Sequence, residues 1–139
     1  MVADEFWGHP IERFSDQGGT MAVGSPAPGL LCSHAKGRAS GAMARFFLQA
    51  CEGVIARAGS IEGFHEWSRL VGYESECRRA ITEWSRSHQD QIRRVHVHVT
   101  QQLVRMGVSV TAMVVPFLES HESRAALVAA FERSLGTVE

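Results

Sequence analysis

Histidine is the residue type in this chain best able to do chemistry, and the chain contains seven of them. His96 and His98 alternate with valines. On an extended strand both imidazoles would therefore lie on one face, about 7 Å apart. Two imidazoles can contribute to a metal site, but such sites use at least three protein ligands. A third would have to come from His34, His65 or Glu66 on a neighbouring strand. Two histidines alone do not predict a metal site. If the chain binds a metal, His96 and His98 are the candidate ligands.

Other reactive side chains show no arrangement that predicts catalysis. His65, Glu66, Tyr73 and His88 lie near one predicted helix, but acid–base catalysis requires such groups to converge on a pocket. The sequence has no G-x-S-x-G elbow, no P-loop and no G-x-G-x-x-G motif. Cys77 falls in the first turn of the same helix, where the helix dipole can lower a thiol pKa. Its position on the apolar side predicts burial instead.

The most informative segment is His65–Arg79 (H-E-W-S-R-L-V-G-Y-E-S-E-C-R-R). A strand is expected to lead into a loop that contains Gly72, and a helix is expected to begin at Glu74–Glu76. The unpaired amides and the dipole of a helix N-terminus favour a negative group. Ser75 is therefore suited to cap the helix or occupy its first turn, and it is also a candidate phosphorylation site.

Composition indicates one globular domain in a reducing compartment. The chain has 139 residues, of which 45% are hydrophobic and 21% charged, so it can bury a core without a disulfide or metal. Fourteen basic and fifteen acidic residues give a net charge of −1, which does not suit a nucleic-acid binder. Three widely spaced cysteines without a C-x-x-C motif argue against disulfides. No apolar run is long enough for a membrane span, so we expect a cytoplasmic protein without membrane contact.

Hydrophobic periodicity predicts alternating strands and helices. The expected strands are 11–14, 20–23, 30–36, 61–67, 93–99 and 115–118, and the expected helices are 40–58, 74–90, 100–113 and one capped by Ser120. Ser40 and Gly59 supply the start and stop signals of the first helix. Such alternation predicts an α/β fold with a mixed, mostly parallel sheet of four to six strands and about four helices. Residues 1–29 would add edge strands and a loop to the domain formed by 30–139.

This order of elements resembles the STAS family, the anti-sigma-factor-antagonist fold found in small bacterial proteins. The resemblance covers Leu30–Leu135 and depends on three stretches: Phe64–Trp84, Val95–Val110 and Ser120–Leu135. In STAS antagonists one strand ends in D-L-S, and a loop then delivers D-S-S-G to a helix start, where a partner kinase phosphorylates the first serine. Here Glu66-Trp67-Ser68 takes the place of the first motif.

Glu74-Ser75-Glu76-Cys77 takes the place of the second motif, and Ser75 matches the switch serine. Glutamate replaces its aspartate, while Glu76 and Cys77 replace its second serine and its glycine. The resemblance therefore implies a regulatory, non-enzymatic module that binds another protein, without a cofactor. The residues expected to contact the partner are Ser68, Tyr73, Glu74, Ser75, Glu76, Arg78 and Arg79.

Two alternatives remain open at this point. STAS-like folds are related in architecture to lipid-transfer domains, and Met106, Met113 and the pair Phe46-Phe47 would line an apolar cavity for a small ligand or lipid. Core packing explains the same residues. The second alternative is a metal-dependent enzyme that uses His65, Glu66, His96 and His98. An exposed edge strand would also permit a homodimer.

Overall fold

The computed structural model describes residues 12–115 and 117–138, in which six strands form one mixed sheet of order β1-β2-β3-β4-β5-β6. The strands are β1 (Glu12–Ser15), β2 (Gly19–Gly24), β3 (Leu30–Ala39), β4 (Ile61–Tyr73), β5 (Ile92–His98) and β6 (Leu118–His121). The β1–β2 and β2–β3 pairs are antiparallel, and β3 through β6 are parallel. This confirms the predicted mixed α/β fold. Residues 1–11, to which the predicted N-terminal segment extends, lie outside the described residues.

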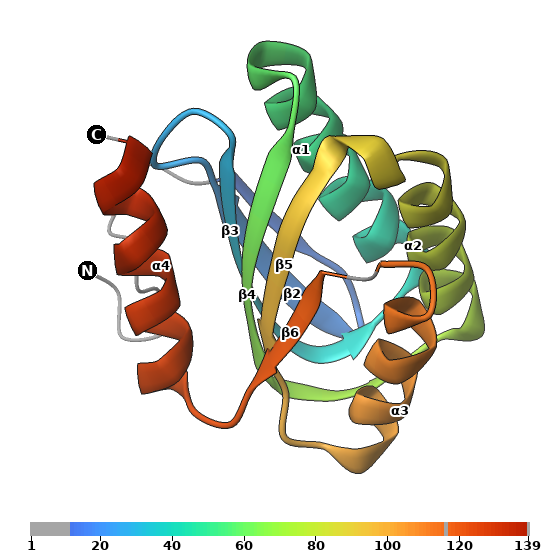
Figure 1. Cartoon of the computed structure of the whole chain (residues 1–139). Helices are drawn as coiled ribbons and strands as arrows, with labels where there is room; N and C mark the ends of the chain where they lie inside the picture. The colour runs from blue at the N-terminus through green and yellow to red at the C-terminus, as the bar shows by residue number, and fades with distance from the viewer. Residues whose placement is uncertain (1–11, 116, 139) are drawn as a thin grey trace.

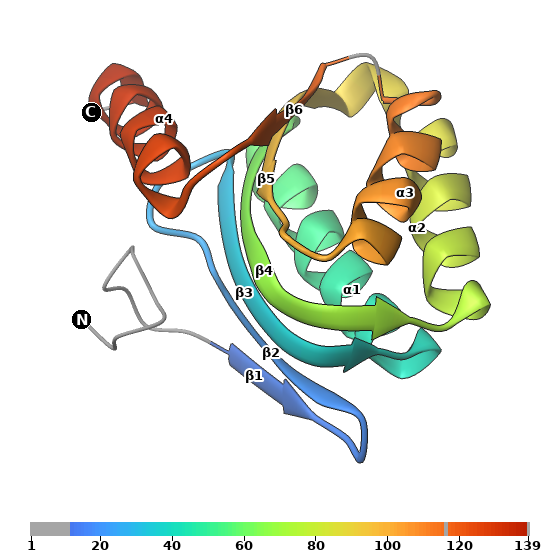
Figure 2. The ribbon, with the colours of Figure 1, turned by 90° about the horizontal axis from the view of Figure 1, so that it is seen from below.

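In the described residues, four α-helices cover the two faces of this sheet unequally: α1 (Gly41–Ala58), α2 (Ser75–Ser87), α3 (Gln102–Ala112) and α4 (Arg124–Val138). Figure 2 shows a curved sheet with α1, α2 and α3 on its concave side and α4 on its convex side. Each crossover between β3, β4, β5 and β6 passes over the concave side (Figure 1). None of the helices in the described part of the chain is long and apolar enough to cross a lipid bilayer.

The first helix matches its prediction at both ends. The Ser40 hydroxyl accepts a hydrogen bond from the amide of Met43 at 3.1 Å, which satisfies one free donor of the first turn. At the other end Gly59 has φ +85°, a left-handed conformation that costs glycine little. The buried side of α1, which includes Phe47 and Cys51, packs on the sheet.

Strands β3 and β4 both run further than predicted. Residues 68–73, expected as a loop, extend β4 to Tyr73 because they continue to pair with β3, up to the pair Ala39–Tyr73. Exposed Arg69 and Val71 alternate with buried Leu70, the period of two that identifies a strand. Irregularities in the β3–β4 register near Gly37 let the two strands bend together.

The C-terminal elements are also shifted along the sequence. The strand predicted at 115–118 is β6 (Leu118–His121), and Ser120 lies within it instead of capping α4. The cap is Ser123, whose hydroxyl accepts from the amide of Ala126 at 3.1 Å. Pairing with β5 sets the position of β6, because its partners are Val95 to His98. Local capping chemistry alone favoured the wrong serine.

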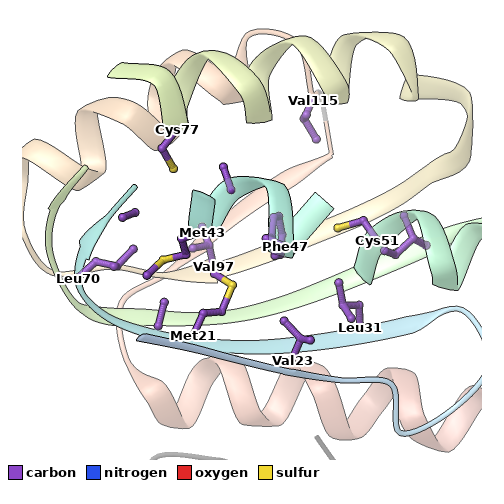
Figure 3. Packing of buried hydrophobic residues seen from close by; sticks show 14 of the residues in the cluster. Met21, Val23, Leu31, Met43, Phe47, Cys51, Leu70, Cys77, Val97 and Val115 are labelled. Atoms are coloured by element: carbon purple, nitrogen blue, oxygen red, sulfur yellow. The ribbon is translucent and has the colours of Figure 1, made fainter. Parts of the chain in front are cut away.

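Two apolar clusters fill the space between the sheet and its helices. The larger lies under α1, α2 and α3, as Figure 3 shows for residues such as Met43, Phe47 and Val97. The smaller lies under α4 and comprises Leu30, Cys32, Phe64, Leu127, Ala130 and Phe131. All three cysteines are buried free thiols. Burial raises the pKa of Cys77 to about 11, so the predicted burial of this residue, and not an activated thiol, is what the structure shows.

Candidate functional site

The segment predicted to contact a partner lies where β4 ends and α2 begins. Ser75, Glu76 and Arg79 are exposed, whereas Ser68, Tyr73, Glu74 and Arg78 are partly buried. Ser75 is the first residue of α2, and Glu74 precedes it at the N-cap position without making a side-chain cap. The segment is therefore open to solvent.

The two glutamates of this segment are engaged with α1. An Oε1 atom of Glu74 accepts a hydrogen bond from the amide of Gly41 at 2.9 Å, and Glu76 forms an ion pair with Arg45 at 2.9 Å. Negative groups at the first turn of a helix are stabilised by its dipole. These carboxylates thus connect the start of α2 to the start of α1, and their charge is partly satisfied within the chain.

Tyr73 packs against α3. Gly107 lies over its ring so closely that a side-chain carbon at position 107 would lie 2.9 Å from Cε1. Tyr73, one of the residues predicted to contact the partner, therefore also supports α3 from below. A glycine at this point of α3 allows the helix to approach the end of β4.

The outer side of α3 carries most of the exposed large hydrophobic side chains that the structure describes. In the described part of the chain the large hydrophobic side chains that are exposed are Val71, Leu103, Met106, Val110, Met113 and Phe117. Four of them belong to α3 or its C-terminal cap, one follows that helix and one lies on β4. Met113 is 83% exposed and Met106 59% exposed. The prediction that these two side chains line an apolar cavity is therefore wrong, and they do not pack in the core either.

An apolar cavity of about 120 Å³ lies between the concave face of the sheet and α1, α2 and α3. Side chains that line it include Phe47, Trp84, Val104 and Val108. Phe47 thus lines the cavity as expected, whereas Phe46 is half-buried and packs on Phe14 with ring centroids 5.5 Å apart. The inner side of α3 faces this cavity while its outer side is exposed.

Buried histidines and glutamates occupy the opposite, α4 face of the sheet. His34, Glu66, His98 and His121 are successive partners across β3, β4, β5 and β6. Nδ1 of His98 lies 3.0 Å from both carboxylate oxygens of Glu66, and Oε1 of Glu66 also accepts from the amide of Ser68 at 3.0 Å. His98 is therefore held by Glu66 and does not point to His96.

His96 belongs to a second network on the same face. Its Nε2 lies 2.9 Å from Oε2 of Glu62, and its Nδ1 lies 3.0 Å from Nε2 of His121. Glu62 also accepts a hydrogen bond from the hydroxyl of Ser134 on α4 at 3.1 Å. The pKa of His121 is lowered, first by burial and then by the neighbouring His96. Glu62, Glu119 and His121 are not among the site residues predicted from the sequence.

His65 points to the concave face and so lies apart from both networks. Its Nδ1 is 2.7 Å from the hydroxyl of Ser33, and its ring stacks on Trp67 with centroids 5.0 Å apart. Burial lowers the pKa of His65 to about 3, so the ring is neutral near pH 7. A metal site that combines His65 with His96 or His98 would require a ligand from the other side of the sheet.

Comparison with known proteins supports this fold. No protein-family model matches the chain. No curated protein matches it either. Among solved structures, one similar chain is an uncharacterized protein of the DUF3478 family from Shewanella loihica PV-4, described as having a SpoIIAA-like fold. The TM-score is 0.61 with 17% sequence identity, over 84% of this chain and 97% of that chain. The protein therefore has a SpoIIAA-like fold, the fold of STAS domains.

Proposed function

We propose that this STAS-type domain is a protein-interaction module that binds a helix of a partner protein on the outer side of α3. The docking surface comprises the exposed apolar side chains of α3 and its cap, bordered by the end of β4 and the start of α2. The predicted segment 68–79 forms one border of this surface. The observation that carries the proposal is the concentration of exposed large hydrophobic side chains on and next to α3.

The spacing of these side chains favours a helix as the occupant. Leu103, Met106, Val110 and Met113 are separated by three, four and three residues. This is the narrow seam along which two helices pack, whereas a helix that lies on a membrane usually presents a wider apolar face. Methionine side chains adapt readily to the shape of a bound helix.

Charge next to the seam favours an acidic partner. Thr82 of α2 lies 3.4 Å from Thr111 of α3, measured between the hydroxyl oxygens. Arg78 and Arg86 are four residues before and after Thr82, so they share the side of α2 that borders α3. Arg105 is exposed on α3 itself. A partner helix with glutamate or aspartate beside its apolar seam would complement these arginines.

Photo-crosslinking tests this proposal directly. A benzophenone side chain in place of Met106 is expected to form an adduct, in lysate of the source cells, with a second protein whose linked peptide is an acidic amphipathic helix. The matched control places the same group at Gln49, an exposed position on α1, and should give no such adduct. Val110→Glu in the Met106 background should abolish the adduct, and Arg78→Glu should reduce it.

Three results would contradict the helix-docking proposal: adducts with a second copy of this chain only, adducts with lipid only, or equal adducts from positions 106 and 49. Circular dichroism of each variant checks that the fold is retained. This control distinguishes a loss of adduct caused by unfolding from one caused by the changed docking surface.

Phosphorylation of Ser75 is a secondary proposal for control of this surface. Ser75 is exposed at the N-terminus of α2, and Arg79 follows it at the i+4 position, where it can pair with a phosphate. Added charge at this border should change binding of an acidic partner. Ser75→Glu is expected to weaken the Met106 adduct, whereas Ser75→Ala should leave it unchanged. Equal adducts from both variants would exclude this switch.

Small-ligand binding is a second candidate function, favoured by the apolar cavity. A volume of about 120 Å³ is comparable to engineered apolar cavities that stay dry and bind benzene. The occupant would be one small apolar molecule. Benzene should shift the methyl resonances of Met43, which lines the cavity, and leave those of exposed Met113 unchanged. Val108→Phe should block the shift, and an unchanged Met43 signal would rule out a cavity open to such a probe.

A further inference from the structure

A cluster of metal-ligating side chains lies between β5 and β6, on the α4 face and away from the docking surface. Nδ1 of His96, a carboxylate oxygen of Glu119 and Nε2 of His121 all lie within 4.8 Å of one another. His96 and Glu119 are direct partners in the β5–β6 register, and His121 follows two residues later on the same face. Two adjacent parallel strands therefore deliver all three groups to one point.

The spacing of these atoms fits a tetrahedral zinc ion. Bonds of 2.0–2.1 Å to nitrogen and oxygen place neighbouring tetrahedral ligands about 3.3 Å apart. Nδ1 of His96 lies 3.0 Å from Nε2 of His121 and 3.6 Å from Oε2 of Glu119. Nε2 of His121 and Oε2 of Glu119 are 3.9 Å apart. Movements of a few tenths of an ångström would complete the coordination geometry.

The groups behind the cluster are those that orient a metal-binding histidine. His96 presents Nδ1 to the cluster while its Nε2 can donate to Glu62, at 2.9 Å. A carboxylate behind a ligating histidine fixes the tautomer and strengthens the imidazole as a donor to metal. Ser134 holds Glu62 in turn, and Arg94 pairs with the second oxygen of Glu119 at 3.1 Å. Stacking on Phe64, with centroids 4.5 Å apart, fixes the ring plane of His96.

The cluster combines a buried ligand with an open side. The side chain of His96 is 4% exposed, that of His121 13% and that of Glu119 46%. An ion held by these three groups would have one position open toward solvent, as zinc sites with a bound water do. A site made only for rigidity would more often be closed by a fourth protein ligand.

We propose that His96, Glu119 and His121 bind one Zn²⁺ ion, with Glu62 orienting His96. This set replaces the pair His96–His98 suggested by the sequence, because His98 is held by Glu66. This proposal does not depend on the docking surface, because neither β6 nor the α4 face contributes a residue to that surface.

The zinc affinity and stoichiometry of the full chain can be measured by competition with a chromophoric chelator. Zinc alone is the probe. The wild-type chain should bind one Zn²⁺, and His121→Ala should weaken binding by about 100-fold or more. Glu62→Gln, which keeps the shape of the orienting group, should weaken it by about 10- to 100-fold. His88→Gln is the matched control, because His88 also lies near a glutamate, Glu52, but outside the cluster; it should leave the affinity unchanged.

Cobalt substitution gives a second measurement that excludes the cysteines. Co²⁺ should produce the visible bands of a four- or five-coordinate nitrogen–oxygen site without a thiolate charge-transfer band. Undiminished zinc binding by a folded His121→Ala chain would overturn the proposal, and so would a wild-type chain that binds no zinc at micromolar concentration. A strong thiolate band would assign the metal to cysteine and overturn it as well.

Discussion

The two faces of the sheet are packed with different kinds of side chain. On the concave face, apolar side chains from the sheet and three helices leave a cavity of about 120 Å³. On the α4 face, a small apolar cluster adjoins histidines and glutamates, among which His96 pairs with Glu62 and His98 pairs with Glu66. Apolar contacts are not directional, so an imperfect fit costs little at any one atom. Buried polar groups need a partner for each donor and acceptor, so the α4 face should be the less tolerant of change.

The largest effect is expected from Phe64→Ala on the α4 face. Phe64 is fully buried, stacks on His96 and makes a T-shaped contact with Phe131, with ring centroids 5.5 Å apart. Its removal should lower the free energy of unfolding by about 4 kcal/mol, measured by urea denaturation. Phe46→Ala, which truncates a half-buried ring, is the control and should cost about 1 kcal/mol. Equal losses of unfolding free energy in the two variants would mean that the deeper burial of Phe64 adds no stability over that of Phe46.

Glu66→Leu should come next, at about 3 kcal/mol. The change leaves Nδ1 of His98 and the amide of Ser68 without their carboxylate acceptor. The double variant Glu66→Leu/His98→Leu should recover part of this loss, because it removes one of the stranded polar groups. Urea denaturation of the two single variants and the double variant gives the coupling energy, and strict additivity would contradict the paired role of Glu66 and His98.

Acid should destabilise the protein through His65 on the concave face. The pKa of His65 is lowered to about 3 in the folded chain from 6.5. The unfolded chain therefore binds the proton first, and the stability contributed by the neutral ring is lost as pH falls from about 6.5 toward 3. The slope should approach about 1.4 kcal/mol per pH unit. His65→Gln, compared with wild type from pH 7 to 5, should remove this slope, and parallel curves would show that His65 does not contribute.

The smallest effect is expected from filling the cavity. Val108→Ile adds one methylene on the inner side of α3, where Val108 lines the cavity. The variant should be more stable by about 0.5–1 kcal/mol, measured by thermal unfolding. Val95→Ile on β5, which also lines the cavity, is a second variant for the same test. Destabilisation by both would show that the concave face is as closely packed as the α4 face.

The element order could be predicted from the sequence because periodicity and caps are local signals. Ser40 and Gly59 delimit α1 as expected, and the Val95–Val97–Val99 alternation identifies β5. The end of β4 lies beyond its predicted position because Gly72 is a local loop signal, and pairing with β3 overrides that signal. The start of α4 was missed because two serines near its N-terminus have equal capping chemistry.

The candidate sites were harder to predict because they depend on long-range register. His96 was visible as a candidate, but Glu119 and His121 become its neighbours only through β5–β6 pairing. The outer side of α3 is exposed, whereas the sequence predicts a cavity or core position for Met106 and Met113, because apolar residues at helical spacing usually face the interior. A single sequence gives the period of such a stripe but not whether another element covers it. A glutamate between apolar residues at position 62 was the signal that could have revealed the orienting carboxylate.

Within residues 12–115 and 117–138, the short strand β6 has a neighbouring strand on one side only. Backbone amides at such a margin are expected to exchange with deuterium faster than those of β4, which has a partner on both sides. Two of the three proposed zinc ligands would then sit on one of the most readily opened segments of the sheet. An ion bound there would hold β6 against β5. Binding would then slow amide hydrogen exchange in residues 118–121 and leave exchange elsewhere unchanged.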